Sequence, residues 1–77
     1  MDNYYRRIRD LREDHDLIQI QVAEYLEIHV NQYARYEKGY RDIPTDLLRK
    51  LAQLYNTSTD YILELTDDPR PYKRITE

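Results

Sequence analysis

The chain has a single glycine, Gly39, among its 77 residues. Tight β-hairpin turns depend on residues that accept a positive φ, and glycine does so most readily. No stretch alternates apolar and polar residues over a length typical of a strand. With one glycine, three prolines and no such alternation, the chain favours helices throughout. We therefore expect an all-α fold.

Apolar residues recur at helical spacing in five segments separated by short polar breaks. The spacing predicts helices over about residues 4–14, 19–26, 30–38, 44–55 and 58–65. Gly39 follows the third segment, where a left-handed residue ends a helix, and Pro44 opens the fourth. We expect one compact five-helix domain over residues 1–66. Residues 67–77 contain two prolines and form a C-terminal tail that we expect to become ordered against a partner.

Composition excludes several classes of protein. Hydrophobic residues make up 40% of the chain, and no run approaches the roughly 20 apolar residues that a membrane span needs. The absence of cysteine excludes disulfide bonds and thiolate zinc sites and fits a reducing compartment. No apolar stretch follows the N-terminus, so we see no secretory signal and expect a cytoplasmic protein.

The charge balance limits how the chain can bind a polyanion. Twelve basic residues against fifteen acidic residues give a formal net charge of -3. This is the wrong sign for a protein that coats nucleic acid without regard to sequence. Any binding to nucleic acid must therefore use a local cluster of basic residues.

Two short predicted helices, 19–26 and 30–38, are the informative feature. About three residues separate them, and longer helices on both sides supply a core, which is the layout of a helix-turn-helix. The small Ala23 lies where the two helices would cross, since a larger side chain there would push them apart. Apolar contacts around it come from Val22, Leu26, Ile28, Tyr33 and Tyr36.

The sequence resembles the Cro/repressor-type helix-turn-helix regulators, also called the XRE family, over about residues 5 to 66. The matching residues are Ile8, Leu11, Arg12, Gln19, the run from Val22 to Leu26, the run from Tyr36 to Gly39, Ile43, Pro44, Leu47, Leu48, Leu51, Ala52, Tyr55, Asn56 and the run from Asp60 to Ile62. The resemblance implies a lambda-repressor-like fold and a homodimer that binds operator DNA. It also implies a regulator of transcription, which we expect to be a repressor.

The sequence departs from the family pattern in both helices and in the turn between them. Ile18 stands where a threonine or serine usually caps the second helix, and a missing hydroxyl cap costs about 1 kcal/mol. Glu27 stands where a turn glycine is common, and a left-handed residue with a Cβ costs about as much. His29 replaces a serine cap, and Tyr33 replaces an aliphatic residue.

If the third helix enters the major groove, its outward side chains meet the base edges. These candidate base contacts are Val30, Asn31, Ala34 and Arg35. Arg35 is the strongest, because a guanidinium can bond guanine in bidentate fashion, while Asn31 suits adenine. The alternative is that Arg35 and Asn31 simply form the solvated face of the helix.

Other residues of the pair of helices are candidates to hold DNA phosphates. They are Gln19, His29, Gln32, Lys38, Gly39, Tyr40 and Arg41. Gln19 lies at a helix N-terminus, where free N–H groups favour an anion. Lys38 and Arg41 have an alternative role, which is to pair with the last carbonyls of the third helix. His29 has the alternative of a neutral helix cap.

Two charged residues are assigned to structure through the resemblance. In the family an arginine of the first helix pairs with a glutamate that ends the third, and Arg12 and Glu37 occupy those places. We expect this pair to be largely buried. Four tyrosines on apolar faces are expected in the core: Tyr33, Tyr36, Tyr55 and Tyr61.

The sequence argues against an enzyme and against a cofactor, a metal site or a small-molecule ligand. His15 and His29 lie in different segments with no further ligand at metal-binding spacing, and there is no glycine-rich phosphate loop. The alternative to DNA binding is a protein-binding module on the same fold, such as an antitoxin or an anti-repressor, which the acidic balance favours slightly. Dimerisation is expected to use the apolar residues Leu65, Tyr72 and Ile75.

Overall fold

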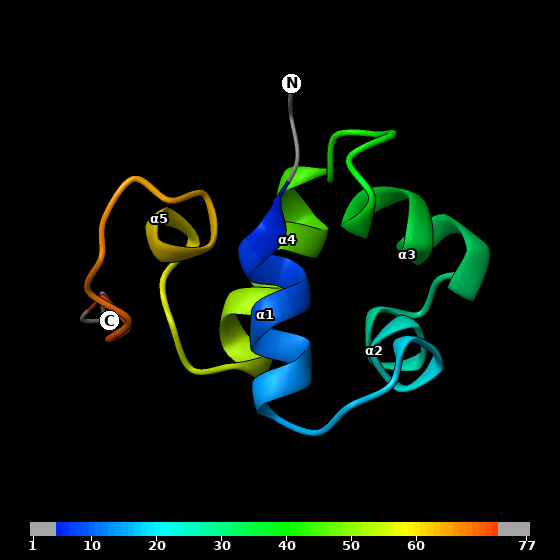
Figure 1. The fold of residues 1–77 in the computed structure, drawn as a ribbon, viewed down its shortest axis with the longest axis horizontal. Helices are drawn as coiled ribbons and strands as arrows, with labels where there is room; N and C mark the ends of the chain where they lie inside the picture. The colour runs from blue at the N-terminus through cyan, green and yellow to red at the C-terminus, as the bar shows by residue number, and fades with distance from the viewer. Residues whose placement is uncertain (1–4, 73–77) are drawn as a thin grey trace, which may run out of the picture.

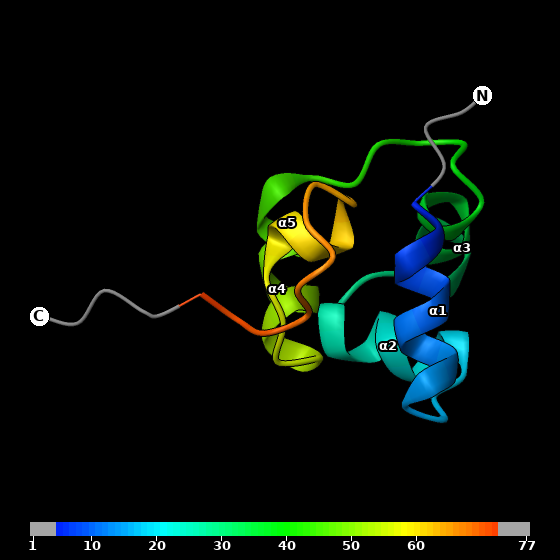
Figure 2. The same cartoon turned by 60° about the vertical axis from the view of Figure 1, so that its left-hand side comes forward.

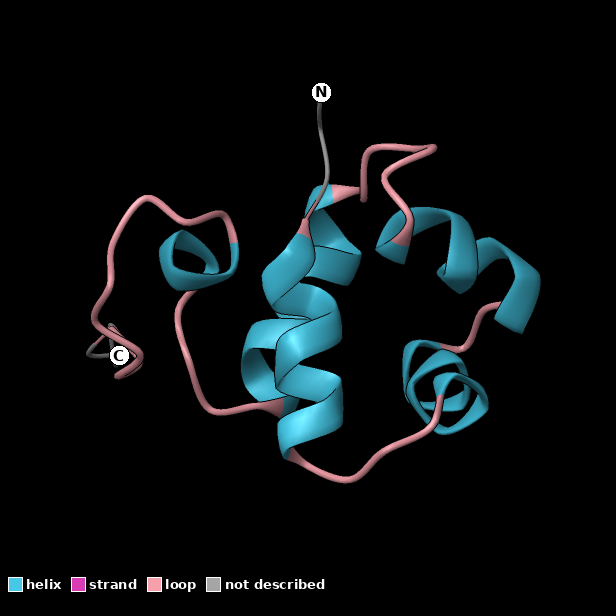
Figure 3. Cartoon of the chain, viewed as in Figure 1, coloured by secondary structure: helices cyan, strands magenta, loops and turns pink. Residues whose placement is uncertain are grey.

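A computed structural model describes residues 5–72 and contains only helices and loops over that range (Figure 3). The all-α prediction is confirmed. The five helices are α1 (Arg6–Asp14), α2 (Gln19–Leu26), α3 (Val30–Glu37), α4 (Thr45–Leu54) and α5 (Thr59–Ile62). Their order and packing are those of a lambda-repressor-like domain.

The helix bounds differ from the sequence prediction mainly at the ends. Tyr4, where the first helix was expected to begin, lies outside the described residues, and Tyr5 is the N-cap of α1. Pro44 stays extended at φ -61° and ψ 150°, so α4 begins one residue later. The largest difference is at α5, which was expected to reach Leu65 but ends at Ile62, because Glu64 adopts a left-handed φ of 64°.

All five helices within residues 5–72 end in the same closure. In each, a left-handed residue follows the helix, and the next N–H bonds back to the carbonyl five residues earlier, over 2.8 to 3.0 Å. The left-handed residues are Asp16, Glu27, Gly39, Asn56 and Glu64. Gly39 was predicted for this conformation, and so was Glu27. The closures at Asp16, Asn56 and Glu64 were not predicted, because these residues have a Cβ and carry no glycine signal.

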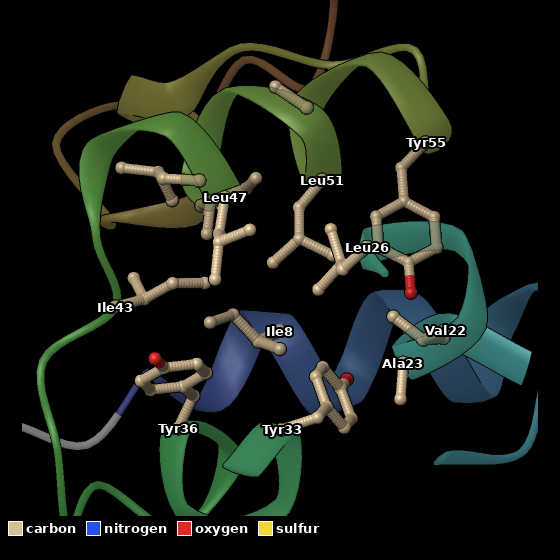
Figure 4. Close-up of a cluster of buried hydrophobic side chains, with 13 residues drawn as sticks. Ile8, Val22, Ala23, Leu26, Tyr33, Tyr36, Ile43, Leu47, Leu51 and Tyr55 are labelled. Carbon is tan, nitrogen blue, oxygen red and sulfur yellow. The ribbon is translucent and has the colours of Figure 1, made fainter. Parts of the chain in front are cut away.

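The helices surround one core. Figure 1 shows α2 and α3 on one side of α1 and α5 on the other, with α4 behind α1. In the turned view of Figure 2, α4 and α5 lie together on the left, α1 and α3 lie on the right, and α2 lies between them. Ile8 of α1 is fully buried between the leucines of α4 and the tyrosines of α3 (Figure 4). The thirteen core residues are Ile8, Val22, Ala23, Leu26, Tyr33, Tyr36, Ile43, Leu47, Leu48, Leu51, Ala52, Tyr55 and Ile62.

Two residues expected in the core are only half-buried. Ile28 packs against the edge of the core. Tyr61 lies under the guanidinium of Arg7, whose carbon is 4.1 Å from the centre of the ring. This geometry is a cation–π contact, which needs one face of the tyrosine to reach a charged group at the surface.

Residues 67–72, set apart from the domain in the sequence analysis, lie against it. Thr57 Oγ1 donates to the carbonyl of Pro69 over 2.6 Å, and the Tyr72 hydroxyl donates to Asp60 Oδ2 over 2.6 Å. Arg7 donates to the carbonyl of Thr66 over 2.7 Å. The C-terminal segment is therefore fastened to α1 and to the start of α5 without a partner.

Candidate nucleic-acid interface

α2 and α3 form a helix-turn-helix. Glu27 ends α2 in a left-handed conformation at φ 62°, and Ile28 N–H bonds back to the carbonyl of Ala23 over 3.0 Å. Ala23 is 1% exposed, as its place at the crossing of the helices requires. In Figure 1, α2 is seen end-on while α3 runs across the view.

The start of α2 has one half of a capping box. The Gln21 side-chain oxygen accepts from the Ile18 backbone N–H over 2.9 Å. The other half is missing, because Ile18 has no side-chain acceptor for the free N–H groups of the first turn.

A buried network ties the pair of helices to α1. Glu37 at the end of α3 is 4% exposed. Arg12 donates to it through Nε over 2.6 Å and through Nη2 over 3.3 Å. Gln19 Nε2 donates to it over 3.0 Å, and the Tyr33 hydroxyl over 2.6 Å. One carboxylate thus receives bonds from α1, α2 and α3, which fixes the position of α3.

The network shifts the pKa values of its members. Burial raises the pKa of Glu37, but the hydrogen bonds from Arg12, Tyr33 and Gln19 outweigh burial, and the pKa lies below its ordinary value. Burial and the bond to Glu37 raise the pKa of the Tyr33 hydroxyl well above its ordinary value. Glu37 is therefore a charged, fully paired carboxylate at neutral pH.

The four candidate base contacts divide by exposure. Asn31 and Arg35 are exposed on the side of α3 that faces away from the core. Val30 and Ala34 are half-buried, and Val30 packs against the core. The structure thus presents the two polar candidates fully and the two apolar ones only in part.

The candidate phosphate contacts lie at two places. His29 precedes α3, is exposed and makes no side-chain cap bond, which argues against its alternative role as a cap. Lys38, Tyr40 and Arg41 are exposed beside Gly39, which is left-handed at φ 79°. Neither Lys38 nor Arg41 has a side-chain hydrogen bond or ion pair within residues 5–72, so their alternative pairing with the carbonyls of α3 is not formed.

Gln19 and Gln32 differ from the expectation of free phosphate contacts. Gln19 is half-buried and its amide nitrogen is committed to Glu37, because that buried carboxylate needs donors. Gln32 is exposed, but its amide nitrogen donates to the Tyr36 hydroxyl over 3.0 Å. Sequence reasoning placed Tyr36 in the core only. Its spacing of four residues from Gln32 was the signal that it also reaches the surface.

Exposed basic residues lie on α3 and just after it, between the exposed acidic residues Glu27 and Asp42. From Ile28 to Arg41 the exposed charged residues are Arg35, Lys38 and Arg41, all basic. The segment has one acidic residue, Glu37, which is buried and paired with Arg12. Asp60 and Glu64 lie in or beside α5, across α1 from α3 (Figure 1). A chain with net charge -3 thus gathers exposed cations around α3.

Comparison with known proteins agrees with this geometry. The helix-turn-helix family model matches residues 8–62, which include all five helices in whole or in part. The chain belongs to this family. Membership identifies residues 8–62 as a helix-turn-helix DNA-binding domain and not as an enzyme domain.

Of three relatives, two are named as transcriptional regulators and one as an antitoxin. The uncharacterized HTH-type transcriptional regulator YobD of Bacillus subtilis is 47% identical over 68 residues, which are 88% of this chain and 61% of YobD. The HTH-type transcriptional regulator ImmR of the same organism is 45% identical over 58 residues, 75% of this chain and 46% of ImmR. The antitoxin PezA of Streptococcus pneumoniae is 36% identical over 53 residues, 69% of this chain and 34% of PezA. No solved structure matches the chain significantly.

Neither a membrane-spanning helix nor a metal-binding group of side chains is found within residues 5–72. No helix within residues 5–72 is long and apolar enough to cross a membrane. Over the same residues, no three histidine or acidic side chains are grouped so that they could hold a metal ion.

Proposed function

We propose that this helix-turn-helix domain is a sequence-specific regulator that binds operator DNA as a homodimer and represses transcription. α3 enters the major groove, and the protein acts in the cytoplasm, where it reaches DNA. The observation that supports this most strongly is that Arg35, Lys38 and Arg41, on α3 and just after it, are exposed in an acidic chain, while Glu37, the one acidic residue from Ile28 to Arg41, is buried. The domain covers about half to two thirds of YobD and ImmR, which are named transcriptional regulators.

The exposed residues of α3 and of the loop after it divide into proposed contacts to DNA bases and proposed contacts to DNA phosphates. Arg35 and Asn31 face away from the core and meet base edges, with Val30 and Ala34 beside them for apolar contact. Lys38, Tyr40 and Arg41 follow at the end of α3, where their side chains and the Gly39 amide hold phosphates on one side of the groove. His29 and the backbone N–H groups at the N-terminus of α2 hold phosphates on the other side, while the Gln19 side chain stays bonded to Glu37.

The role of Arg35 can be tested with one pair of variants. Arg35→Ala is expected to lose most of the preference for the operator over a mixed-sequence duplex, about 1 to 3 kcal/mol, while binding to the mixed duplex falls much less. Arg49→Ala is the matched control, because it removes the same charge from an exposed position on α4. Equal loss of preference in both variants would contradict the proposed position of α3.

The dimer is proposed to form through the C-terminal side of the domain. Leu65 is 71% exposed and Tyr72 is 62% exposed, and both are large apolar residues. Ile75, the third residue expected there, lies outside the described residues. Two copies that share this apolar surface on a two-fold axis would present two copies of α3 related by the same symmetry, as an inverted-repeat operator requires.

A second candidate is a protein-binding module, which the similarity to the antitoxin PezA favours. In that case a partner protein would meet the acidic side of the domain at Asp60, Glu64 and Asp67. A measurement of DNA binding distinguishes the two functions. A DNA-binding regulator loses affinity for DNA steeply between about 50 and 200 mM salt. A domain used only for protein binding would show no affinity for DNA at either salt concentration.

A further inference from the structure

A small polar hollow lies where the end of α3 meets the loop to α4. Its volume is about 220 Å³, and it is lined by Gln32, Arg35, Tyr36 and Arg41. Both arginines are exposed and no acidic residue lines the hollow. A hollow of this size with two cations and several N–H and O–H donors suits a small oxyanion.

Tyr36 fixes the position of Gln32 on this hollow. The tyrosine ring is 5% exposed and packs in the core beside Ile8 (Figure 4), so its hydroxyl has a set position. Gln32 Nε2 donates to that hydroxyl over 3.0 Å. The hydroxyl keeps its own hydrogen and the amide keeps a second one, and both remain available as donors to an anion in the hollow.

Resting on the proposed DNA-binding function, we propose that this hollow binds one backbone phosphate and that Tyr36 is a positioning residue that holds Gln32 against it. Arg41 supplies the charge from the loop. Arg35 also lines the hollow and is the residue proposed above to contact the bases. Tyr36 thus links the hydrophobic core to a contact with DNA, a role beyond core packing.

The test is the affinity for a short mixed-sequence DNA duplex over a series of salt concentrations, because phosphate contacts act on every sequence. Tyr36→Phe and Gln32→Ala are each expected to weaken binding about tenfold. The double variant is expected to bind no more weakly than Gln32→Ala alone, because the hydroxyl acts through Gln32. Arg41→Ala is expected to lower the slope of log affinity against log salt by about 1, whereas both neutral variants leave it unchanged.

Tyr55→Phe is the matched control for loss of a tyrosine hydroxyl. Tyr55 is also 5% exposed, and its hydroxyl has no hydrogen-bond partner within residues 5–72, so its removal should leave the duplex affinity unchanged. Wild-type affinity in Tyr36→Phe, or additive losses in the double variant, would overturn the positioning role. An unchanged slope in Arg41→Ala would overturn the phosphate site. Failure of the wild-type protein to bind any duplex would instead overturn the proposed function, and this inference with it.

Discussion

Among single residues, Glu37 is the one on which the position of α3 depends most. Its carboxylate receives bonds from Arg12, Gln19 and Tyr33, which belong to three different helices. The Arg12 side chain is 12% exposed and that of Glu37 is 4% exposed. Removal of one partner from such a pair leaves a buried charge without compensation.

Arg12→Ala is therefore expected to lower the free energy of unfolding by about 3 to 5 kcal/mol. The control is Arg9→Ala, which breaks an ion pair with Glu13 on the same helix whose side chains are 56% and 52% exposed. That change should cost about 0.5 kcal/mol or less, because water screens the pair. Denaturant unfolding measures both, and equal losses would show that Glu37 does not need Arg12.

The lowered pKa of Glu37 makes stability depend on pH in a definite direction. The folded protein binds the proton less readily than the unfolded chain, so this contribution is present above the ordinary pKa of about 4.3 and is lost as pH falls through the folded value. Wild-type protein is expected to exceed Glu37→Gln in unfolding free energy at neutral pH, with the difference shrinking below about pH 4. A difference that is constant with pH would contradict the charged state of Glu37.

The roles of some residues in this network were predictable from the sequence, and those of others were not. Arg12 and Glu37 were named through the family resemblance and are paired in the structure. Gln19 was expected to meet a phosphate, because a sequence shows that a residue opens a helix but not which buried group lies beneath it. The bond from Gln32 to Tyr36 was missed because Tyr36 was considered only as an apolar residue.

Among the structural elements, the turn of the helix-turn-helix carries a steric cost. Four of the five helix closures in the described chain use a residue with a Cβ in the left-handed region, and Glu27 is the one between α2 and α3. Such a residue is crowded by its own Cβ, at about 1 kcal/mol or more. The helix order was predictable from apolar spacing, but these closures were not, because glycine is the main signal for them and the chain has one.

Glu27→Gly is expected to raise the free energy of unfolding by about 0.5 to 1 kcal/mol, since relief of crowding exceeds the added entropy of the unfolded chain. The control is Glu24→Gly, an exposed position within α2, where glycine should lower stability by about 1 kcal/mol. Thermal unfolding of both variants measures the contrast. If both Glu27→Gly and Glu24→Gly lowered the unfolding temperature, the Glu27 side chain would stabilise the fold by more than its steric crowding destabilises it.

At the scale of the whole molecule, the C-terminal segment is part of the folded unit. Thr57 and Tyr72 donate to the Pro69 carbonyl and to Asp60, and no local pattern predicts these bonds because each joins residues 12 apart, with α5 or part of it between them. From the sequence alone, the two prolines of this segment predicted a tail separate from the domain. The same segment leaves Tyr72 largely exposed beside the domain, where a second copy can cover it.

Truncation after Asp68 is expected to give a monomer, because it removes Tyr72 and the Pro69 carbonyl that fastens the segment. Sedimentation equilibrium measures the mass, and circular dichroism confirms that the helices remain. Leu65→Ser in the untruncated chain makes the surface less apolar but keeps the C-terminal segment, so it tests the two contributions separately. A dimeric mass in both variants would remove this side of the molecule from the interface.

Whether α3 reads a DNA sequence is tested most directly by selection of bound duplexes from a random-sequence pool at about 100 mM salt. We expect enrichment of an inverted repeat with half-sites about one helical turn apart. Such a repeat would carry guanine contacts that disappear when the selection is repeated with Arg35→Ala. A pool that stays random would contradict sequence reading by α3 and would direct attention to a protein partner.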